Sequence, residues 1–154
     1  MTKLNIINKD ILTVEKGIIV QQVNAIGKTG AGLSGAINAK YPQVKEHYLE
    51  EFKYGLPLGK VLYTNVGSML WVLSIVGQQN VGTYKVQTDF SALRQGLNKV
   101  AQFAKEAEVD TFIPYLLGSS LAGGPTQQTK QETWNKVSSI IWEEIPDAII
   151  CRKV

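Results

Sequence analysis

The chain has 154 residues, of which 44% are hydrophobic and 19% are charged, and this ordinary composition excludes intrinsic disorder. Its formal net charge of +3 favours an anionic ligand but is too small to indicate nucleic acid binding, which we do not expect. Cys151 is the only cysteine, which excludes an internal disulfide, and neither a signal peptide nor an apolar stretch of membrane-spanning length is visible. We therefore expect a single domain over residues 1–154, located in the cytoplasm and without membrane contact.

The first part of the sequence alternates apolar runs with helical patterns. Leu4–Ile7 and Ile18–Val23 predict strands, and the second is apolar enough to be buried on both faces of a sheet. Gly30–Lys40 predicts a helix. Pro42 stands where a further helix can begin, and the Gly-Leu-Pro sequence at residues 55–57 ends that helix.

A β-hairpin is predicted in the middle of the chain. Lys60–Asn65 and Leu70–Val76 are two apolar runs separated by Val66–Ser68, which has the residues of a tight turn. We expect Gly77 to end the second strand, followed by a polar loop that continues to Thr88.

The last part returns to alternating helices and strands. Asp89 is expected to be the N-cap of a helix over Ser91–Lys105, and residues 111–115 predict a buried strand. A helix over residues 125–144 and a strand over residues 148–152 follow. This order, with one antiparallel pair, predicts an α/β fold: a three-layer α/β/α sandwich with a central mixed sheet.

The most informative stretch is Val23–Ile37, which reads VNAIGKTGAGLSGAI. It connects a predicted strand to the start of a predicted helix, and four of its residues are glycine. Glycine accepts positive φ angles and lets backbone amides approach a ligand closely. Because a helix N-terminus also presents unpaired N–H groups and a favourable dipole, we interpret this stretch as one wall of a phosphate-binding site.

Two common nucleotide motifs do not account for this stretch. Gly27-Lys28-Thr29 imitates the end of a P-loop, but that motif needs a glycine five positions earlier, where the sequence has Gln22. Gly30–Gly35 satisfies G-x-G-x-x-G, but six residues separate it from the strand and the next segment is helical. A dinucleotide-binding fold has neither feature.

A third family matches more of the chain. The sequence VNAIGKTGAGLSGAINAKYP (residues 23–42) resembles the first ligand loop of macrodomains, which are ADP-ribose-binding modules. Ile113–Gly124, reading IPYLLGSSLAGG, resembles the second phosphate loop of the same branch, and Asp10-Ile11 resembles an early Asp-Ile pair of the family. The resemblance implies a macrodomain fold with a ligand cleft between two glycine-rich loops.

The resemblance also implies a set of ligand contacts. Asp10 would accept a hydrogen bond from the adenine amino group, and the alternative is an aspartate that caps a turn. Asn24 would hold a ribose hydroxyl, and the alternative is a turn asparagine bonded to its own backbone. The full set of expected ligand-binding residues is Asp10, Ile11, Asn24, Gly30, Ala31, Gly32, Leu33, Ser34, Gly118, Ser119, Ser120, Leu121 and Ala122.

The residues that catalyse hydrolysis in the family are not found. One hydrolase pattern has an asparagine and an acid where this sequence has Gly27 and Ser34. Another has a lysine after the middle strands and an aspartate in the second loop. The nearest positions here are Gly77 or Gln78, and Ala122.

Four other residues have chemistry that a site can use. His47 is expected on the surface, Lys28 in a solvated loop with the option of pairing with a phosphate, Asp89 at an N-cap and Cys151 in the core.

Three functional hypotheses remain open. The first is a binding module for ADP-ribose or a close derivative, either a small molecule or a group on an ADP-ribosylated macromolecule. The second is a hydrolase or phosphatase that acts on ADP-ribosyl groups or on ADP-ribose 1″-phosphate, with unknown catalytic residues. The third is a structural protein that binds no nucleotide. We expect no bound metal and no cofactor.

Overall fold

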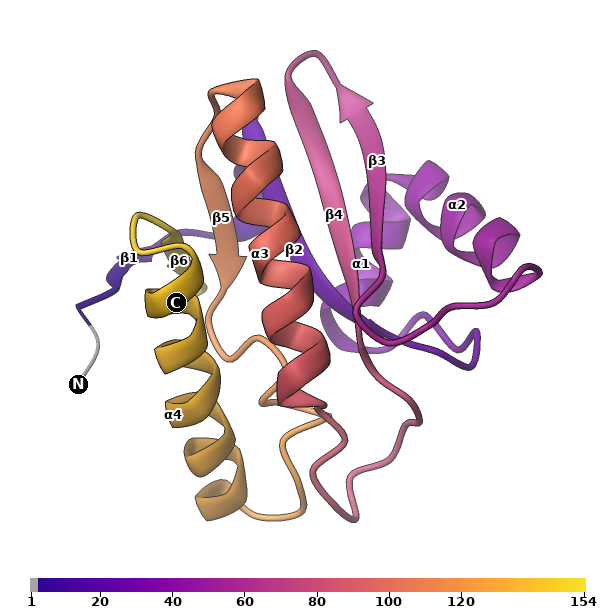
Figure 1. Ribbon diagram of the computed structural model, residues 1–154, viewed down its shortest axis with the longest axis vertical. Helices are drawn as coiled ribbons and strands as arrows, with labels where there is room; N and C mark the ends of the chain where they lie inside the picture. Colours follow the sequence, from indigo (N-terminus) through magenta and orange to yellow (C-terminus); the bar gives the residue numbers. More distant parts are fainter. Residues whose placement is uncertain (1–2) are drawn as a thin grey trace.

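The computed structural model describes residues 3–154 and contains a six-stranded sheet with the strand order β1-β6-β5-β2-β4-β3 (Figure 1). The strands are β1 (Asn5–Asn8), β2 (Gly17–Asn24), β3 (Val61–Gly67), β4 (Leu70–Gln78), β5 (Thr111–Pro114) and β6 (Ile149–Arg152). The helices are the 3₁₀ turn η1 (Ile11–Thr13), α1 (Gly32–Lys40), α2 (Pro42–Phe52), α3 (Phe90–Ala107) and α4 (Gln127–Glu144).

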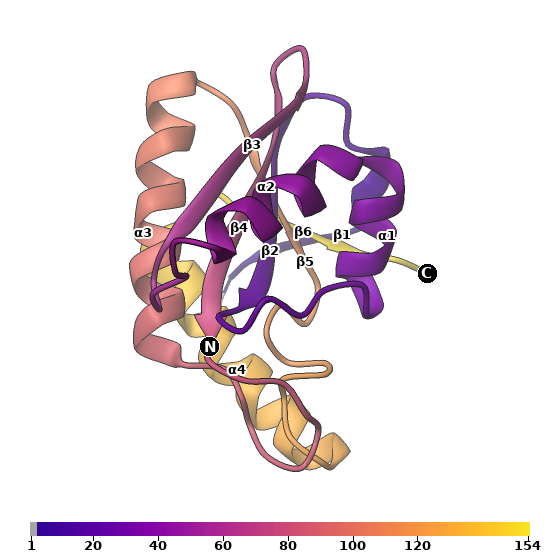
Figure 2. The same ribbon diagram turned by 90° about the vertical axis from the view of Figure 1, so that its right-hand side faces the viewer.

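The sheet is mixed and lies between two helical layers, as the sequence predicts. Strands β3 and β4 are antiparallel, and all the other neighbouring pairs are parallel. Figure 2 shows α3 and α4 on one face of the sheet and α1 and α2 on the other. None of the helices within residues 3–154 is both long and apolar enough to cross a membrane.

Strand β2 is the centre of the hydrophobic core. Ile18 and Val20 pack in the cluster that contains Leu97 of α3, whereas Ile19 packs in the cluster that contains Ile37 of α1. Successive side chains of a strand point to opposite faces, so an apolar run buries both of them. This explains why β2 is apolar without alternation up to Val20.

The prediction that Gly77 ends its strand is wrong. Strand β4 continues to Gln78, and the β2–β4 register shifts because Val76 pairs with Val23 and Gln78 pairs with Asn24. Gly77 is therefore the extra residue of a β-bulge. A Cβ at Gly77 would stand 2.5 Å from the side-chain oxygen of Gln22, so the position requires glycine for close packing and not for chain termination.

Two other boundaries differ from the prediction. Helix α1 begins at Gly32 and not at Gly30, because the N-cap residue Ala31 is extended, with φ −100° and ψ 147°. Strand β3 extends to Gly67, so the hairpin turn lies at Ser68 and Met69.

Helix α3 packs so closely on the sheet that one glycine in it cannot be replaced without cost. A Cβ at Gly96 would overlap Cγ2 of Ile75 in β4. Alanine normally stabilises a helix interior relative to glycine by about 0.5–1 kcal/mol. We expect the opposite for Gly96→Ala, a loss of about 1–3 kcal/mol in the free energy of unfolding, because overpacking outweighs helix propensity. Urea denaturation measures this change, and an increase in stability would contradict the expected packing.

Candidate functional site

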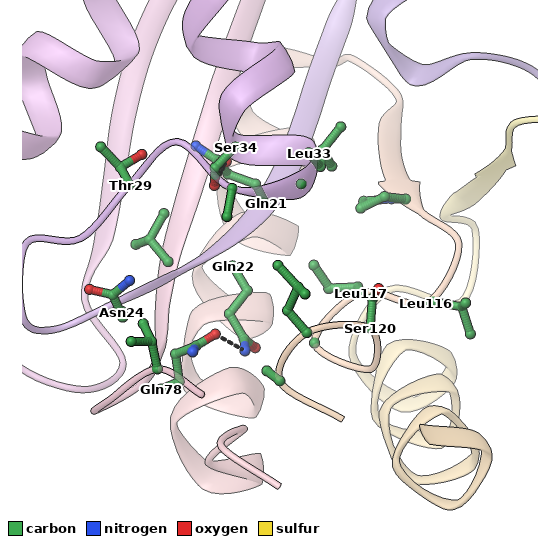
Figure 3. A pocket seen from close by; sticks show the side chains of 18 of the residues that line it. Gln21, Gln22, Asn24, Thr29, Leu33, Ser34, Gln78, Leu116, Leu117 and Ser120 are labelled. Carbon is green, nitrogen blue, oxygen red and sulfur yellow. Dashed lines mark hydrogen bonds between the residues drawn. The ribbon is translucent and has the colours of Figure 1, made fainter. Parts of the chain in front are cut away.

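A cleft of about 650 Å³ opens at the carboxyl ends of β2, β4 and β5 (Figure 3). The chain leaves β2 toward α1 on one face of the sheet and leaves β5 toward α4 on the other face. Between two parallel strands whose connections leave in opposite directions, the loops separate and leave a crevice, which is where open α/β sheets bind ligands. The topology alone therefore places a candidate site between β2 and β5.

The first loop is organised by Asn24, at the end of β2. Its side-chain oxygen accepts hydrogen bonds from the N–H of Ile26 and of Lys28, both at 3.1 Å, and the Tyr48 hydroxyl lies 2.7 Å from the backbone oxygen and 2.8 Å from the side-chain oxygen of Asn24. Its side-chain nitrogen donates to the Lys28 carbonyl at 2.6 Å. Burial raises the pKa of Tyr48 to about 12, so this hydroxyl stays a donor. Of the two alternatives for Asn24, these bonds are those of the turn asparagine, and one amide hydrogen remains for a ligand.

The structure explains why position 27 is occupied by glycine. Gly27 has φ +79°, and a Cβ there would stand 2.8 Å from the ring of Phe52 at the end of α2. An asparagine, which one hydrolase pattern has at this position, would both strain the backbone and collide with that ring. The ring of Phe52, which is 42% exposed, would have to move to admit that residue.

The N-terminus of α1 faces the cleft without a cap. Ala31 occupies the N-cap position and makes no side-chain hydrogen bond, while Gly30 and Gly32 have φ angles of +109° and +55°. Gly32, Leu33 and Ser34 form the first turn and line the cleft. The N–H groups of a first turn have no acceptor within the helix, so they attract an anion, and the helix dipole adds to this attraction.

The second loop closes the opposite side. Gly118 has φ +65° and its carbonyl accepts a hydrogen bond of 2.6 Å from the Thr88 hydroxyl, which ties this loop to the segment before α3. Leu121 is 52% exposed, and its Cδ1 lies 3.5 Å from the place where a Cβ on Gly32 would stand. The two glycine-rich loops therefore approach each other across the cleft. Ser119 is fully buried and bonds to the Leu117 carbonyl.

Glutamines at the strand ends were not predicted as site residues. The side-chain nitrogen of Gln22 donates to the side-chain oxygen of Gln78 and to the Thr88 hydroxyl, both at 2.9 Å, and Figure 3 shows the first of these bonds at the base of the cleft. The sequence signal was the Gln21-Gln22 pair inside an otherwise apolar strand. Polar side chains in a buried strand need partners, which indicates a site at that point.

Asp10 and Ile11 lie outside the lining of the cleft. The Asp10 carboxylate caps η1 by accepting a 3.0 Å hydrogen bond from the Leu12 N–H, and its second oxygen lies 3.4 Å from the Lys153 ammonium. The Leu12 bond, more than the Lys153 charge, holds the pKa of Asp10 below its usual value, against a smaller opposing effect of burial. These contacts are those of the turn-capping alternative.

The cleft brings together the expected residues of both loops except Ser119, and it leaves out Asp10 and Ile11. The expected residues that line it are Asn24, Gly30, Ala31, Gly32, Leu33, Ser34, Gly118, Ser120, Leu121 and Ala122. Lining residues that were not predicted from the sequence are Gln21, Gln22, Val23, Thr29, Gln78, Val81, Gly82, Thr83, Pro114, Tyr115, Leu116 and Leu117, and Lys28 was expected there only as a partner for a phosphate.

Among the described residues that line the cleft, Lys28 is the only charged one, and none carries a carboxyl, imidazole or thiol group. The side chain of His47 is 33% exposed at the surface, and its ring bonds to the Thr64 hydroxyl at 2.8 Å. Asp89 accepts a hydrogen bond from the Ala92 N–H and caps α3. Cys151 is buried in the core, and this burial raises the pKa of its thiol.

Among known proteins, matches to this chain are found only among solved structures. Neither the protein-family models nor the curated proteins contain a match to this chain. A protein of unknown function from Bacteroides thetaiotaomicron is 27% identical with a TM-score of 0.83, and 99% of each chain is covered. A macrodomain protein from Streptomyces coelicolor is 22% identical with a TM-score of 0.79, again with 99% of each chain covered. Thermosipho africanus DarTG, in a complex with ADP-ribose, is 15% identical with a TM-score of 0.73, over 99% of this chain and 42% of that one.

Proposed function

We propose that this protein, which has the macrodomain fold, binds ADP-ribose or a close derivative in the cleft between its two glycine-rich loops. The observation that carries the proposal is the uncapped N-terminus of α1, which lines one cleft together with the second loop. Two loops of this kind form a site for a diphosphate, because backbone N–H groups and the helix dipole both favour negative charge. The solved complex of DarTG with ADP-ribose, which has a similar fold, supports the same ligand class.

The two ends of the cleft differ in polarity, and this orients the ligand. Asn24, Thr29 and Ser34 lie toward one end, and Leu116 and Leu117 lie toward the other together with one hydroxyl, that of Ser120 (Figure 3). A ribose with free hydroxyls fits the polar end, and the flat, apolar adenine ring fits the leucine end. The diphosphate then lies between the loops.

Asp10 follows β1, at the same edge of the sheet as the apolar end of the cleft, because β1, β6 and β5 are parallel. Pro114, at the end of β5, pairs with Cys151 of β6, and Cys151 pairs in turn with Ile7 of β1. An adenine ring at the leucine end therefore extends toward Asp10. The Asp10 oxygen that faces Lys153 is the acceptor we propose for the adenine amino group.

Isothermal titration calorimetry with ADP-ribose, AMP and ribose 5-phosphate tests the proposed function. We expect ADP-ribose to bind most tightly, because only this ligand reaches both ends of the cleft and the loops between them. The absence of ADP-ribose binding, or affinity for AMP equal to that for ADP-ribose, would refute the proposal. The same titration with an ADP-ribosylated peptide shows whether the group is also recognised on a macromolecule.

The role of Asp10 is tested by Asp10→Ala. We expect ADP-ribose affinity to fall by about 1.5–3 kcal/mol, the usual contribution of a hydrogen bond to a charged group. Affinity for ribose 5-phosphate should not change, because this ligand has no adenine. The control is Lys153→Ala, which removes the ion-pair partner of Asp10 at 3.4 Å and should leave ADP-ribose affinity intact or increase it. Equal losses for both ligands would show that Asp10 acts only by capping η1.

A further inference from the structure

The loop that follows β4, residues 79–88, forms a third wall of the cleft at its polar end. Its residues 81–83 line the cleft. Gln78, the last residue of β4, pairs with Asn24 of β2, and Figure 3 shows both on the side of the cleft opposite the leucines. In the proposed orientation the distal ribose lies at this end. A group attached to that ribose therefore leaves the cleft beside this loop.

Hydrogen bonds anchor the loop at its base. The side-chain nitrogen of Gln87 donates to the Val81 carbonyl across the loop at 3.4 Å, and the backbone N–H of Gln87 donates to the Ala122 carbonyl at 2.9 Å. Val86 also forms an isolated antiparallel bridge with Gly123 of the second glycine-rich loop. The tip of the loop is thus held in place before any partner binds, which lowers the entropic cost of binding.

The tip presents an aromatic ring beside the mouth of the cleft. Tyr84 is 70% exposed. A Cβ at Gly82, which lines the cleft, would stand 2.7 Å from Cε1 of the Tyr84 ring, so the ring lies directly against the Gly82 backbone. The Lys85 ammonium lies 6.0 Å from the ring centroid. Exposed tyrosines with a fixed position are typical of surfaces that bind other proteins.

The mouth of the cleft carries only positive charge. Its three loops, residues 24–31, 79–88 and 115–126, contain none of the 13 acidic residues of the chain, and their only charged residues are Lys28 and Lys85. Within residues 3–154, neither lysine forms an ion pair. Lys85 is exposed and lies outside the lining of the cleft, so a diphosphate between the glycine-rich loops does not account for its charge.

We propose that Tyr84 and Lys85 bind the carrier of the ADP-ribose group, and that this carrier is an acidic segment of a modified protein. Lys85 pairs with a carboxylate that flanks the modified residue, and Tyr84 packs against the peptide chain. The inference rests on the proposed binding of ADP-ribose and adds the class of partner that the same site accepts.

The small number of cations favours a peptide over a nucleic acid. A protein that binds nucleic acid typically neutralises about six to ten phosphates. Two lysines at the mouth and a formal net charge of +3 do not supply that many contacts. A peptide with one or two carboxylates beside its modified residue needs no more than these lysines.

Two synthetic peptides, each ADP-ribosylated on one serine, test the inference by calorimetry. In one peptide the serine is flanked by glutamates, and in the other by glutamines. We expect the glutamate peptide to bind about threefold to tenfold more tightly, the effect of one or two exposed ion pairs. The difference should disappear at an ionic strength of about 1 M, where the Debye length is only about 3 Å.

Substitutions separate the loop tip from the rest of the surface. Lys85→Gln should remove the preference for the glutamate peptide and change the affinity for free ADP-ribose less than about twofold, because an exposed ion pair contributes little beyond its own partner. The matched control is Lys45→Gln, which changes the net charge equally at an exposed position of α2 outside the three loops and should keep the preference. Tyr84→Ser should weaken both peptides at least about threefold and leave free ADP-ribose unaffected, because the lost apolar contact is made with the peptide alone.

Equal affinity of the wild-type protein for the two peptides, equal effects of Lys85→Gln and Lys45→Gln, or unchanged peptide affinity in Tyr84→Ser would overturn the inference. Tighter binding of an ADP-ribosylated single-stranded oligonucleotide than of the glutamate peptide would also overturn it, because the carrier would then be a nucleic acid. Failure of the wild-type protein to bind free ADP-ribose would instead refute the proposed function itself. The two failures are therefore distinguishable in the same set of titrations.

Discussion

Ala31→Glu should abolish ADP-ribose binding while the folded protein keeps its stability. Ala31 is the N-cap of α1, is exposed and lines the cleft, and its φ of −100° accepts any side chain without strain. A carboxylate at this position competes with the ligand diphosphate for the N–H groups of the first turn. Two like charges about 4 Å apart near a protein surface repel by about 4 kcal/mol, so we expect at least a 100-fold loss of affinity in calorimetry.

The same change should not destabilise the fold, because an acidic residue at a helix N-terminus interacts favourably with the helix dipole. The matched control is Ala36→Glu, which places the same charge on an exposed position of the same helix away from the cleft lining. Ala36→Glu should bind ADP-ribose nearly as the wild type does. If Ala31→Glu bound ADP-ribose normally, the diphosphate would not lie at this helix end.

The elements that the sequence predicts well are those whose determinants are local. The N-cap at Asp89 needs only the N–H of Ala92 three residues later, and Gly30 needs only its own positive φ angle. The buried strand β2 follows from the apolar run of its own residues. Local determinants are visible in a sequence because they lie within one turn or one strand.

The parts that were missed depend on residues far apart in the chain. Gln22 bonds to Gln78 and Thr88, which are 56 and 66 residues away, and Gly77 is required by the same Gln22 side chain. A glycine after an apolar strand fits chain termination and a bulge equally well until the partner strand is known. Only the pairing of β2 with β4 shows that Gly77 lies in a bulge and does not end the strand.

Asn24 shows the same limit inside the predicted site. Its amide suits both a ribose and a turn, and the sequence left both alternatives open. The N–H groups of Ile26 and Lys28 fill its side-chain oxygen, and Tyr48, which comes from α2, places its hydroxyl beside both oxygens of Asn24. The fold of the loop thus takes up most of the hydrogen-bonding capacity that the sequence offered to a ligand.

The second large effect concerns catalysis: we expect slow or absent release of ADP-ribose from modified aspartate or glutamate side chains. Ser34 and Ala122 occupy the acid positions of the two hydrolase patterns, and no described residue that lines the cleft has a carboxyl or imidazole group. General acid–base assistance typically accelerates a reaction about 10²–10⁴-fold, so this protein should be slower than a complete enzyme by a factor in that range. Release of labelled ADP-ribose from a modified protein measures the rate.

Ser34→Asp is the corresponding gain-of-function variant, and the structure indicates how the site would accommodate it. The Ser34 hydroxyl now donates to the side-chain oxygen of Gln21, and a carboxylate would repel that oxygen. Rotation of the Gln21 amide by 180° turns its nitrogen toward the new carboxylate and its oxygen toward the Ser74 hydroxyl, which can donate. We expect the release rate to rise about 100-fold, at the lower end of the range for acid–base catalysis, with weaker ADP-ribose binding because the charge lies near the diphosphate.

Ser34→Asn, similar in size but uncharged, should not gain activity. Rapid release by the unmodified protein that Ser34→Ala does not slow would contradict this mechanism and would require a base from outside the lining residues, such as Asp89 or the substrate itself.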